Sequence, residues 1–174
     1  GSVEYPGYGP LASDRASEEA LIDVAEGAMA LFYAQPDVRR ARVVLVGQSL
    51  GTGVAAALAA RGHGGHLVLM TPFRSITAVA QDLLPWLPVR WMVRDRFDTE
   101  SLAPRIAQPV TIVHGTRDGV VPYAHGQSLA RTFATCTAGC ESLSMVSPCA
   151  SIASRCLPRA TNDTSQPALA RWPP

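Results

Sequence analysis

One stretch, residues 42–60, constrains the fold more than any other part of the chain. Residues 42–46 have strand character, residues 47–51 read Gly-Gln-Ser-Leu-Gly, and an alanine-rich helical pattern then runs to Ala60. A strand–turn–helix unit of this kind holds a serine on a sharp, strained turn with its hydroxyl clear of the sheet. Gly47 and Gly51 are small enough for strand and helix to pack closely beneath it. The stretch therefore predicts an α/β chain with an exposed serine at Ser49.

Short apolar strands alternate with helical patterns along the first part of the chain. Further strands are predicted at residues 66–70 and 110–113. Helices are predicted from Ser17, a capping residue, to just before Pro36, and at residues 123–133. Strands that are almost wholly apolar are typical of a parallel sheet covered on both faces. We therefore predict a partial α/β fold, a mostly parallel sheet with flanking helices, over residues 1–135.

Two segments depart from this pattern. Residues 72–103 are rich in large apolar side chains, and Pro72, Pro85 and Pro88 forbid one long helix. An insertion between core strands is where an apolar cap over a site is expected, and ordinary core packing is the alternative. Residues 136–174 are rich in cysteine, serine and proline, which predicts a divergent and poorly ordered tail in which only residues 142–146 have strand character.

Composition and charge exclude several classes of function. The net charge is +1, which provides no electrostatic basis for binding nucleic acid, and the absence of lysine excludes a catalytic lysine. No apolar run of about 18 residues is present, so no transmembrane segment is predicted. The four cysteines match no zinc spacing, and we expect incidental thiols, no metal and no cofactor. The compartment cannot be read from the sequence.

Asp118 is the candidate carboxylate partner of Ser49. A serine nucleophile needs a base to accept its proton, and the base needs a carboxylate to orient it. Asp118 lies in a tight loop just after the predicted strand at residues 110–113, at the sheet edge where sites of open parallel sheets collect. The order serine then aspartate also fits serine hydrolases. A turn aspartate bonded to its own backbone is the alternative.

Five segments together resemble the α/β-hydrolase superfamily. They are YPGYG at residues 5–9, GQSLGTG at 47–53, TPFRSI at 71–76, LPVRWMVRDRFD at 87–98 and HGTRDGVVP at 114–122. The likeness is nearest to the α/β-hydrolase-domain protein depalmitoylases and the serine aminopeptidase-like group. It implies Ser49 as nucleophile, Asp118 as triad acid and the backbone N–H of Leu50 as an oxyanion donor. The implied activity is hydrolysis of an ester or thioester through an acyl-enzyme, on a small acyl substrate or an S-acylated protein.

Two departures from the family pattern bear on activity. The family's catalytic histidine follows the last strand, but this chain has no histidine after His125. The catalytic histidine is therefore unknown. We expect His125 to help a helix start or to face solvent rather than to serve as the base, His114 to be structural, and His63 and His66 to lie at the surface. The earlier strand and loop that supply the second oxyanion donor are also absent, which predicts a partial chain with an open, aggregation-prone sheet edge.

Three hypotheses follow. The first is an active ester or thioester hydrolase. The second is a relic that keeps the fold and serves at most as a binding module, because loss of the triad histidine lowers turnover by several orders of magnitude. The third is a truncated product without a stable function. Either a changed reading frame or genuine divergence explains the tail, and the sequence leaves the natural substrate and the oligomeric state open.

Overall fold

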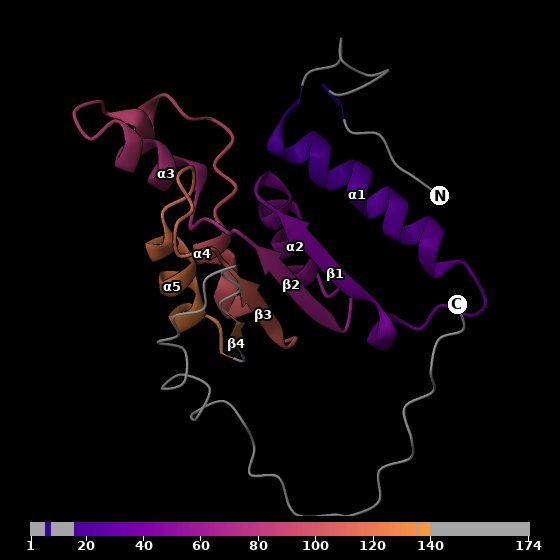
Figure 1. Ribbon diagram of the computed structural model, residues 1–174. Coiled ribbons are helices and arrows are strands. Elements are labelled where there is room, and N and C mark those ends of the chain that lie inside the picture. Colours follow the sequence, from indigo (N-terminus) through magenta and orange to yellow (C-terminus); the bar gives the residue numbers. More distant parts are fainter. Residues whose placement is uncertain (1–5, 8–15, 135, 140–174) are drawn as a thin grey trace, which may run out of the picture.

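The computed structural model describes residues 6–7, 16–134 and 136–139 (Figure 1). Its centre is a parallel sheet in the order β1-β2-β3-β4, formed by β1 Val44–Gln48, β2 His66–Met70, β3 Val110–Val113 and β4 Cys136–Gly139. The helices are α1 Glu18–Tyr33, α2 Leu50–Ala60, α3 Ile76–Leu83, α4 Thr99–Leu102 and α5 Tyr123–Thr132. Three short 3-10 turns lie at Arg40–Arg42, Val89–Trp91 and Ala103–Arg105. The predicted α/β fold with a parallel sheet and flanking helices is confirmed.

The hydrophobic core lies on one face of the sheet. Buried residues of α1, α2 and α5 share a single cluster with the sheet residues Leu45, Leu67, Leu69, Val110 and Ile112. On the opposite face, Val44 and Val46 of β1 are 53% and 62% exposed. Because β–α–β crossovers are right-handed and the strand order runs in one direction, every crossover places its helix on the same side. The expectation of helices on both faces is therefore wrong for the described part of the chain.

The strands differ from the sequence prediction at the two edges of the sheet. The inner strands β2 and β3 coincide with their predicted ranges. β1 begins at Val44 rather than at residue 42, because the chain first makes the 3-10 turn Arg40–Arg42. β4 falls in the segment predicted as tail, and its small residues pair in parallel with β3. The strand expected at residues 142–146 lies outside the described residues.

Helix α1 begins and ends close to the predicted residues. The Ser17 hydroxyl accepts a hydrogen bond from the Ala20 N–H at 3.2 Å, which confirms the predicted cap. Leu21, Ile22 and Ala25 are buried in its first half. Leu31 and Phe32, near its end, are 74% and 48% exposed. Helix α1 is therefore buried in its first half and exposed toward its end.

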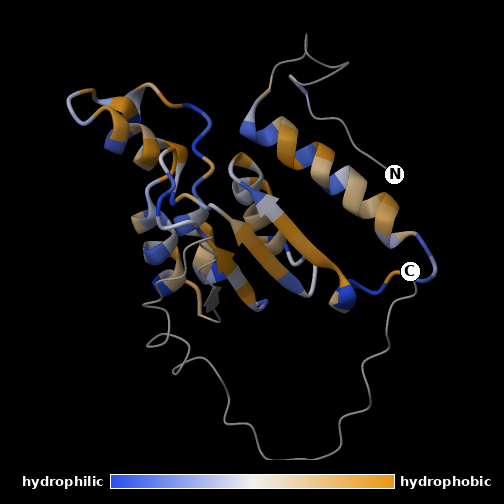
Figure 2. Cartoon of the chain, viewed as in Figure 1, coloured by the Kyte–Doolittle hydropathy of each residue, from blue (hydrophilic) through white to orange (hydrophobic). Residues whose placement is uncertain are grey.

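The insertion between β2 and β3 is divided between core and surface. Phe73, Val89 and Phe97 are buried, as the core-packing alternative expects. Trp86 and Trp91, by contrast, are 77% and 86% exposed. In Figure 1, α3 and the loop after it project beyond the carboxyl ends of β1 and β2, and Figure 2 shows that hydrophobic colouring continues into this projecting part. Among the described helices, none has the length and apolar character needed to cross a bilayer.

Candidate active site

Ser49 occupies a strained turn between β1 and α2. Its φ of 49° and ψ of −121° lie where side chains are disfavoured, at a cost of about 1–3 kcal/mol. Three hydrogen bonds hold the turn: the Ser49 N–H donates to the Met70 carbonyl at 3.1 Å, and the Thr52 N–H and hydroxyl donate to the Ser49 carbonyl at 2.9 and 2.6 Å. The side chain of Ser49 is exposed. The predicted geometry of an exposed serine on a sharp turn is therefore present.

Gly47 is required for the close approach of β1 and α2. A Cβ atom at Gly47 would collide with the Gly51 carbonyl oxygen and lie 2.8 Å from Thr52 Cα. At Gly51, by contrast, a Cβ would meet no atom of the described residues within 4 Å, apart from its own helix and chain neighbours. The predicted packing role is thus correct for Gly47 and wrong for Gly51, because the side-chain position of Gly51 points into open space.

The backbone N–H of Leu50 lies at the start of α2. The first N–H groups of a helix have no intrahelical acceptor, and the helix dipole makes this end positive. Within the described residues the Leu50 N–H has no hydrogen-bond acceptor, so it is available to a negatively charged oxygen beside Ser49. Its part as an oxyanion donor stays a prediction.

Asp118 lies in the loop after β3, at the same edge of the sheet. Its Oδ1 accepts hydrogen bonds from the Val120 and Val121 N–H groups, each at 2.9 Å, and its Oδ2 is 3.8 Å from His114 Nε2. Burial acts to raise the pKa of Asp118, but the two N–H donors and the His114 ring outweigh it and lower the pKa below its usual value. One carboxylate oxygen therefore holds its own turn, as the structural alternative expects.

His125 is buried, with only 3% of its surface exposed. The Arg74 N–H donates to Nδ1 at 3.2 Å, so Nδ1 carries no proton, and Nε2–H donates to Asp82 Oδ2 at 2.9 Å. His125 lies in the first turn of α5, as expected, but the expectation that it faces solvent is wrong. The ring instead joins α5 to the insertion through two partners that are remote in sequence, and for that reason neither Asp82 nor Arg74 stood out in the sequence.

The other histidines also have partners. His114 is buried, and its Nε2 donates to the Val121 carbonyl at 3.0 Å, in keeping with the expected structural role. Its pKa is lowered, chiefly by burial. His63 stacks on the Tyr33 ring at 5.7 Å, and His66 Nε2 lies 2.9 Å from Thr111 Oγ1. Both residues are of intermediate exposure, so they lie only partly at the surface.

No histidine is placed as a base for Ser49. All four histidines of the chain lie in the described part, and no hydrogen bond joins any of their rings to Ser49 there. The structure therefore brings Ser49 and the Leu50 N–H together and places Asp118 at the same sheet edge, without a histidine linking the carboxylate to the serine. The described residues contain no group of three or more side chains suited to holding a metal ion.

Comparisons with known proteins agree with this architecture. The model of the alpha/beta hydrolase family matches residues 2–173. The chain is 33% identical over 128 residues to the alpha/beta hydrolase domain-containing protein aho-3 of Caenorhabditis elegans, covering 74% of this chain and 37% of that protein. It is 32% identical over 128 residues to the alpha/beta hydrolase domain-containing protein 17B of Homo sapiens, covering 74% of this chain and 43% of the relative.

Solved structures show the same fold at lower sequence identity. Est1E from Butyrivibrio proteoclasticus, solved with bound ferulic acid, has a TM-score of 0.63 and 18% identity, covering 79% of this chain and 65% of that one. The chain spans less than half the length of the curated relatives it matches, between 37% and 43% for the two named above. A family match over residues 2–173, together with a parallel sheet whose first strand enters its helix through a strained serine, shows that this chain belongs to the alpha/beta hydrolase family.

Proposed function

We propose that the chain carries the nucleophilic part of a serine hydrolase that acts on esters or thioesters. The observation that carries this proposal is the conformation of Ser49, a non-glycine residue held at φ 49° on an exposed turn. Strain of this kind persists only where the surrounding structure enforces it, and it is concentrated at functional sites. Gly47 and the hydrogen bonds from Thr52 enforce it here.

The reaction would proceed through an acyl-enzyme. Ser49 Oγ attacks the carbonyl carbon of the substrate and loses its proton to a base, while the Leu50 N–H donates to the oxyanion that forms. Collapse of the tetrahedral intermediate breaks the bond to the alcohol or thiol, which leaves with the proton. Water then attacks the acyl-enzyme, and the base takes the water's proton and returns it to Ser49 as the acid departs.

Asp118 would orient the base in this scheme. Its lowered pKa keeps the carboxylate charged at neutral pH, as an orienting group for an imidazolium requires. None of the four histidines of this chain lies between Asp118 and Ser49, so efficient turnover requires a base from outside these 174 residues.

A second candidate function is a relic that binds an acyl ligand without turning it over. The observation that favours it is that each of the four histidine rings has a partner other than Ser49. Without a general base, oxyanion stabilisation and binding alone leave only about 10³–10⁴-fold acceleration over water.

Labelling with a fluorophosphonate probe tests the nucleophile directly, because the probe reacts covalently with an activated serine. Because no histidine of the chain is placed as a base for Ser49, we expect slow labelling of the chain, its loss in Ser49→Ala, and its retention in the matched control Ser101→Ala, which changes an exposed serine on α4. Equal labelling of the chain and Ser49→Ala would show that Ser49 is not the nucleophile. Folded protein that reacts with no probe would favour the relic.

Turnover distinguishes the substrate class. We expect slow release of thiol from short- and long-chain acyl thioesters and no cleavage of peptide amides. A preference for peptide amides would overturn the proposed substrate class while leaving Ser49 as the nucleophile.

A further inference from the structure

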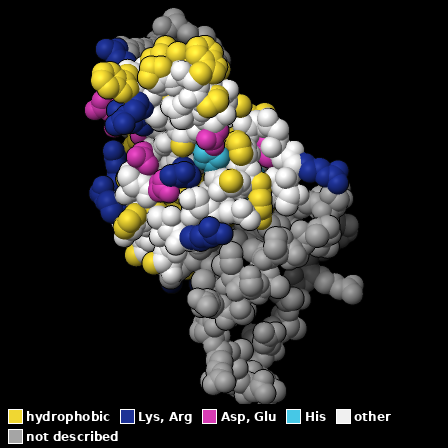
Figure 3. All heavy atoms as spheres, turned by 90° about the vertical axis from the view of Figure 1, so that its left-hand side faces the viewer, with side chains coloured by type: hydrophobic (Ala, Val, Ile, Leu, Met, Phe, Trp, Pro, Cys, Tyr) yellow, Lys and Arg dark blue, Asp and Glu magenta, His cyan; other side chains and the backbone are white. Residues whose placement is uncertain are grey.

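The insertion exposes a cluster of large apolar side chains. These are Leu83, Leu84, Trp86, Trp91 and Met92, with 60%, 39%, 77%, 86% and 65% of their surfaces exposed. Figure 3 shows hydrophobic side chains gathered at the top of this side of the molecule, with arginine side chains beside them. Exposed apolar patches of this kind mark interaction sites. Tryptophan in particular is enriched at membrane–water interfaces, because its ring is apolar and its N–H is polar.

Three arginines border the same cluster. Arg90, Arg94 and Arg96 are exposed and line an open hollow of about 720 Å³ together with Trp91, Val93 and Asp95. Within the described residues, none of the three forms an ion pair. Asp95 is the acidic residue among those that line the hollow, and the Glu18 carboxylate lies beside it, accepting a hydrogen bond from the Arg96 N–H at 2.8 Å. Three arginines against one aspartate leave the lining itself with a net positive charge.

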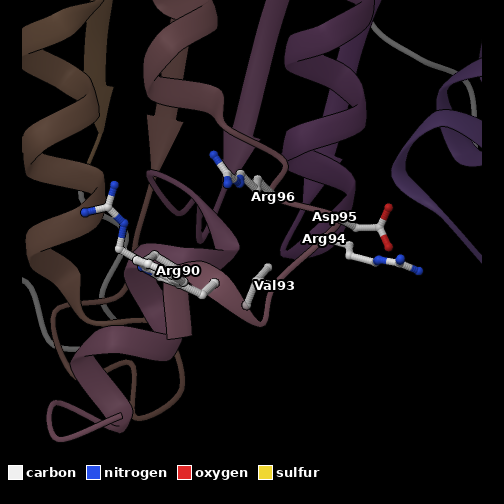
Figure 4. Close-up of a pocket in the computed structure, with 6 residues that line it drawn as sticks. Arg90, Val93, Arg94, Asp95 and Arg96 are labelled. Atoms are coloured by element: carbon white, nitrogen blue, oxygen red, sulfur yellow. The ribbon is translucent and has the colours of Figure 1, made fainter. Parts of the chain in front are cut away.

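The arginines do not converge on one point. In Figure 4, the side chains of Arg90 and Arg94 extend to opposite sides of Val93, and the side chain of Arg96 points in a third direction. Several arginines can share a single phosphate only if their guanidinium groups converge on it, so the hollow is not built for one small anion held by all three. Spread charges beside tryptophan fit a surface with many separate anionic groups, and the arginine stems can lie along its apolar boundary.

The cluster also lies at the edge of the sheet that carries Ser49. The insertion begins directly after Met70, and Met70 pairs with Gln48 and accepts the Ser49 N–H. We propose that Leu83, Leu84, Trp86, Trp91 and Met92, with the three arginines, form a docking surface for an anionic lipid bilayer. Two copies of the chain packed through this surface would bring six arginines together, which disfavours self-association as its use.

Vesicle binding by the full chain tests this proposal, with a spectroscopic readout at the docking surface itself. The chain has three tryptophans, and Trp172→Phe leaves only Trp86 and Trp91, both on the surface in question. We expect this variant to float with vesicles in which about a third of the phosphatidylcholine is replaced by phosphatidylserine, with a blue shift of its fluorescence. Binding should weaken at high salt, because salt screens the arginines.

Matched variants separate the apolar and the charged contributions. Trp86→Ala/Trp91→Ala should abolish flotation, whereas Leu31→Ala/Val120→Ala, which changes equally exposed residues elsewhere, should bind normally. Arg90→Gln/Arg94→Gln should bind the anionic vesicles about 25-fold more weakly, from a factor of about five for each arginine. Arg39→Gln/Arg105→Gln makes the same change in net charge at exposed positions outside the proposed docking surface, so vesicle binding by this variant should fall much less.

Several outcomes would overturn the proposal. One is equal loss of binding in the two arginine pairs, which would show a response to net charge alone. Another is flotation without a fluorescence shift. A third is a concentration-dependent dimer in sedimentation that Trp86→Ala/Trp91→Ala dissociates, which would assign the surface to a second copy. None of these measurements depends on the reactivity of Ser49, so the two proposals can fail separately.

Discussion

At the scale of single residues, the strand–turn–helix segment at residues 47–51 depends on close contacts that only some of its residues make. Gly47 faces α2 across a gap too small for a methyl group, whereas Gly51 faces open space. Both are glycines of the same motif, so the motif does not distinguish a steric requirement from a tolerated position. The structure does, and it makes the two residues a natural pair for comparison.

Replacement of Gly47 by alanine should destabilise the fold by about 3 kcal/mol, because the added Cβ meets backbone atoms that cannot rotate away. Gly51→Ala should change the free energy of unfolding by less than about 1 kcal/mol, with stabilisation expected, since alanine favours the helix. Urea unfolding followed by circular dichroism measures both. Equal losses in the two variants would contradict the assigned contacts.

His114 predicts a dependence of stability on pH. Burial lowers its pKa in the folded state, so the unfolded chain binds a proton at a higher pH than the folded chain does. Stability is therefore complete above the unfolded value of about 6.5 and falls as the pH drops below it. The lowered pKa of Asp118 adds a second loss that begins only below about pH 4.

The expected result is a urea midpoint that is lower at pH 5 than at pH 7, with a smaller difference in His114→Gln. The two proteins are compared by how steeply the urea midpoint changes with pH, and not by the midpoint itself, because the substitution also alters buried packing beside Gly126. An unchanged slope in the variant would assign the effect to other groups.

At the scale of elements, α1 and the end of the insertion hold each other in place. The Glu18 carboxylate accepts hydrogen bonds from the Arg96 and Phe97 N–H groups at 2.8 and 2.9 Å, and the Glu18 N–H donates to Asp95 at 2.9 Å. Phe97 is buried against α2, where a side chain on Gly53 would come within 2.7 Å of it. The first turn of α1 thus fixes where the insertion returns to the core.

Glu18→Ala should loosen this junction. Loss of about 1.5 kcal/mol of charged hydrogen bonding raises local opening roughly tenfold. Trypsin cleaves only at arginine in this chain, so faster cleavage after Arg94 or Arg96 reports the opening. Glu19→Ala is the matched control, because Glu19 lies in the same helical turn and is exposed. Equal acceleration in both variants would show that the effect comes from helix charge instead.

How well an element is predicted follows from where its stabilising contacts come from. β2 and β3 match their predicted ranges, because apolar runs bounded by glycine or proline identify buried strands. β4 was missed because Cys136–Gly139 has no apolar pattern, and its pairing with β3 is a contact across the chain. The burial of His125 was missed for the same reason, since Asp82 and Arg74 belong to a distant segment.

At the scale of the whole molecule, the sheet ends at the strand that carries the nucleophile. β1 pairs with β2 on one side only in the described part, and its outward face exposes Val44 and Val46. An unpaired strand edge next to exposed valines is a template for pairing with another chain. Among the described strands, β1 thus forms the open edge that the sequence led us to expect.

Charge on this face should reduce self-association. Val46→Lys places a cation on the exposed side of β1 without touching the core, because Val46 is 62% exposed. Light scattering on heating should show a higher onset temperature of aggregation in this variant than in the parent chain. Val120→Lys adds the same charge at an exposed loop position and should help less. Equal protection by both would point to net charge as the cause.

The insertion leaves and rejoins the core at two kinks. Thr71, directly after β2, has a φ of 47°, and Phe97, just before α4, has a φ of 42°. Thr71 is tied to β3 through the Val113 carbonyl at 2.8 Å, and Phe97 is tied to Glu18. Both anchoring points are thus tied to elements outside the insertion. Evolution can therefore replace the segment between Thr71 and Phe97 without displacing Ser49. Related chains can then differ in the molecules that this segment contacts while the geometry at Ser49 stays the same.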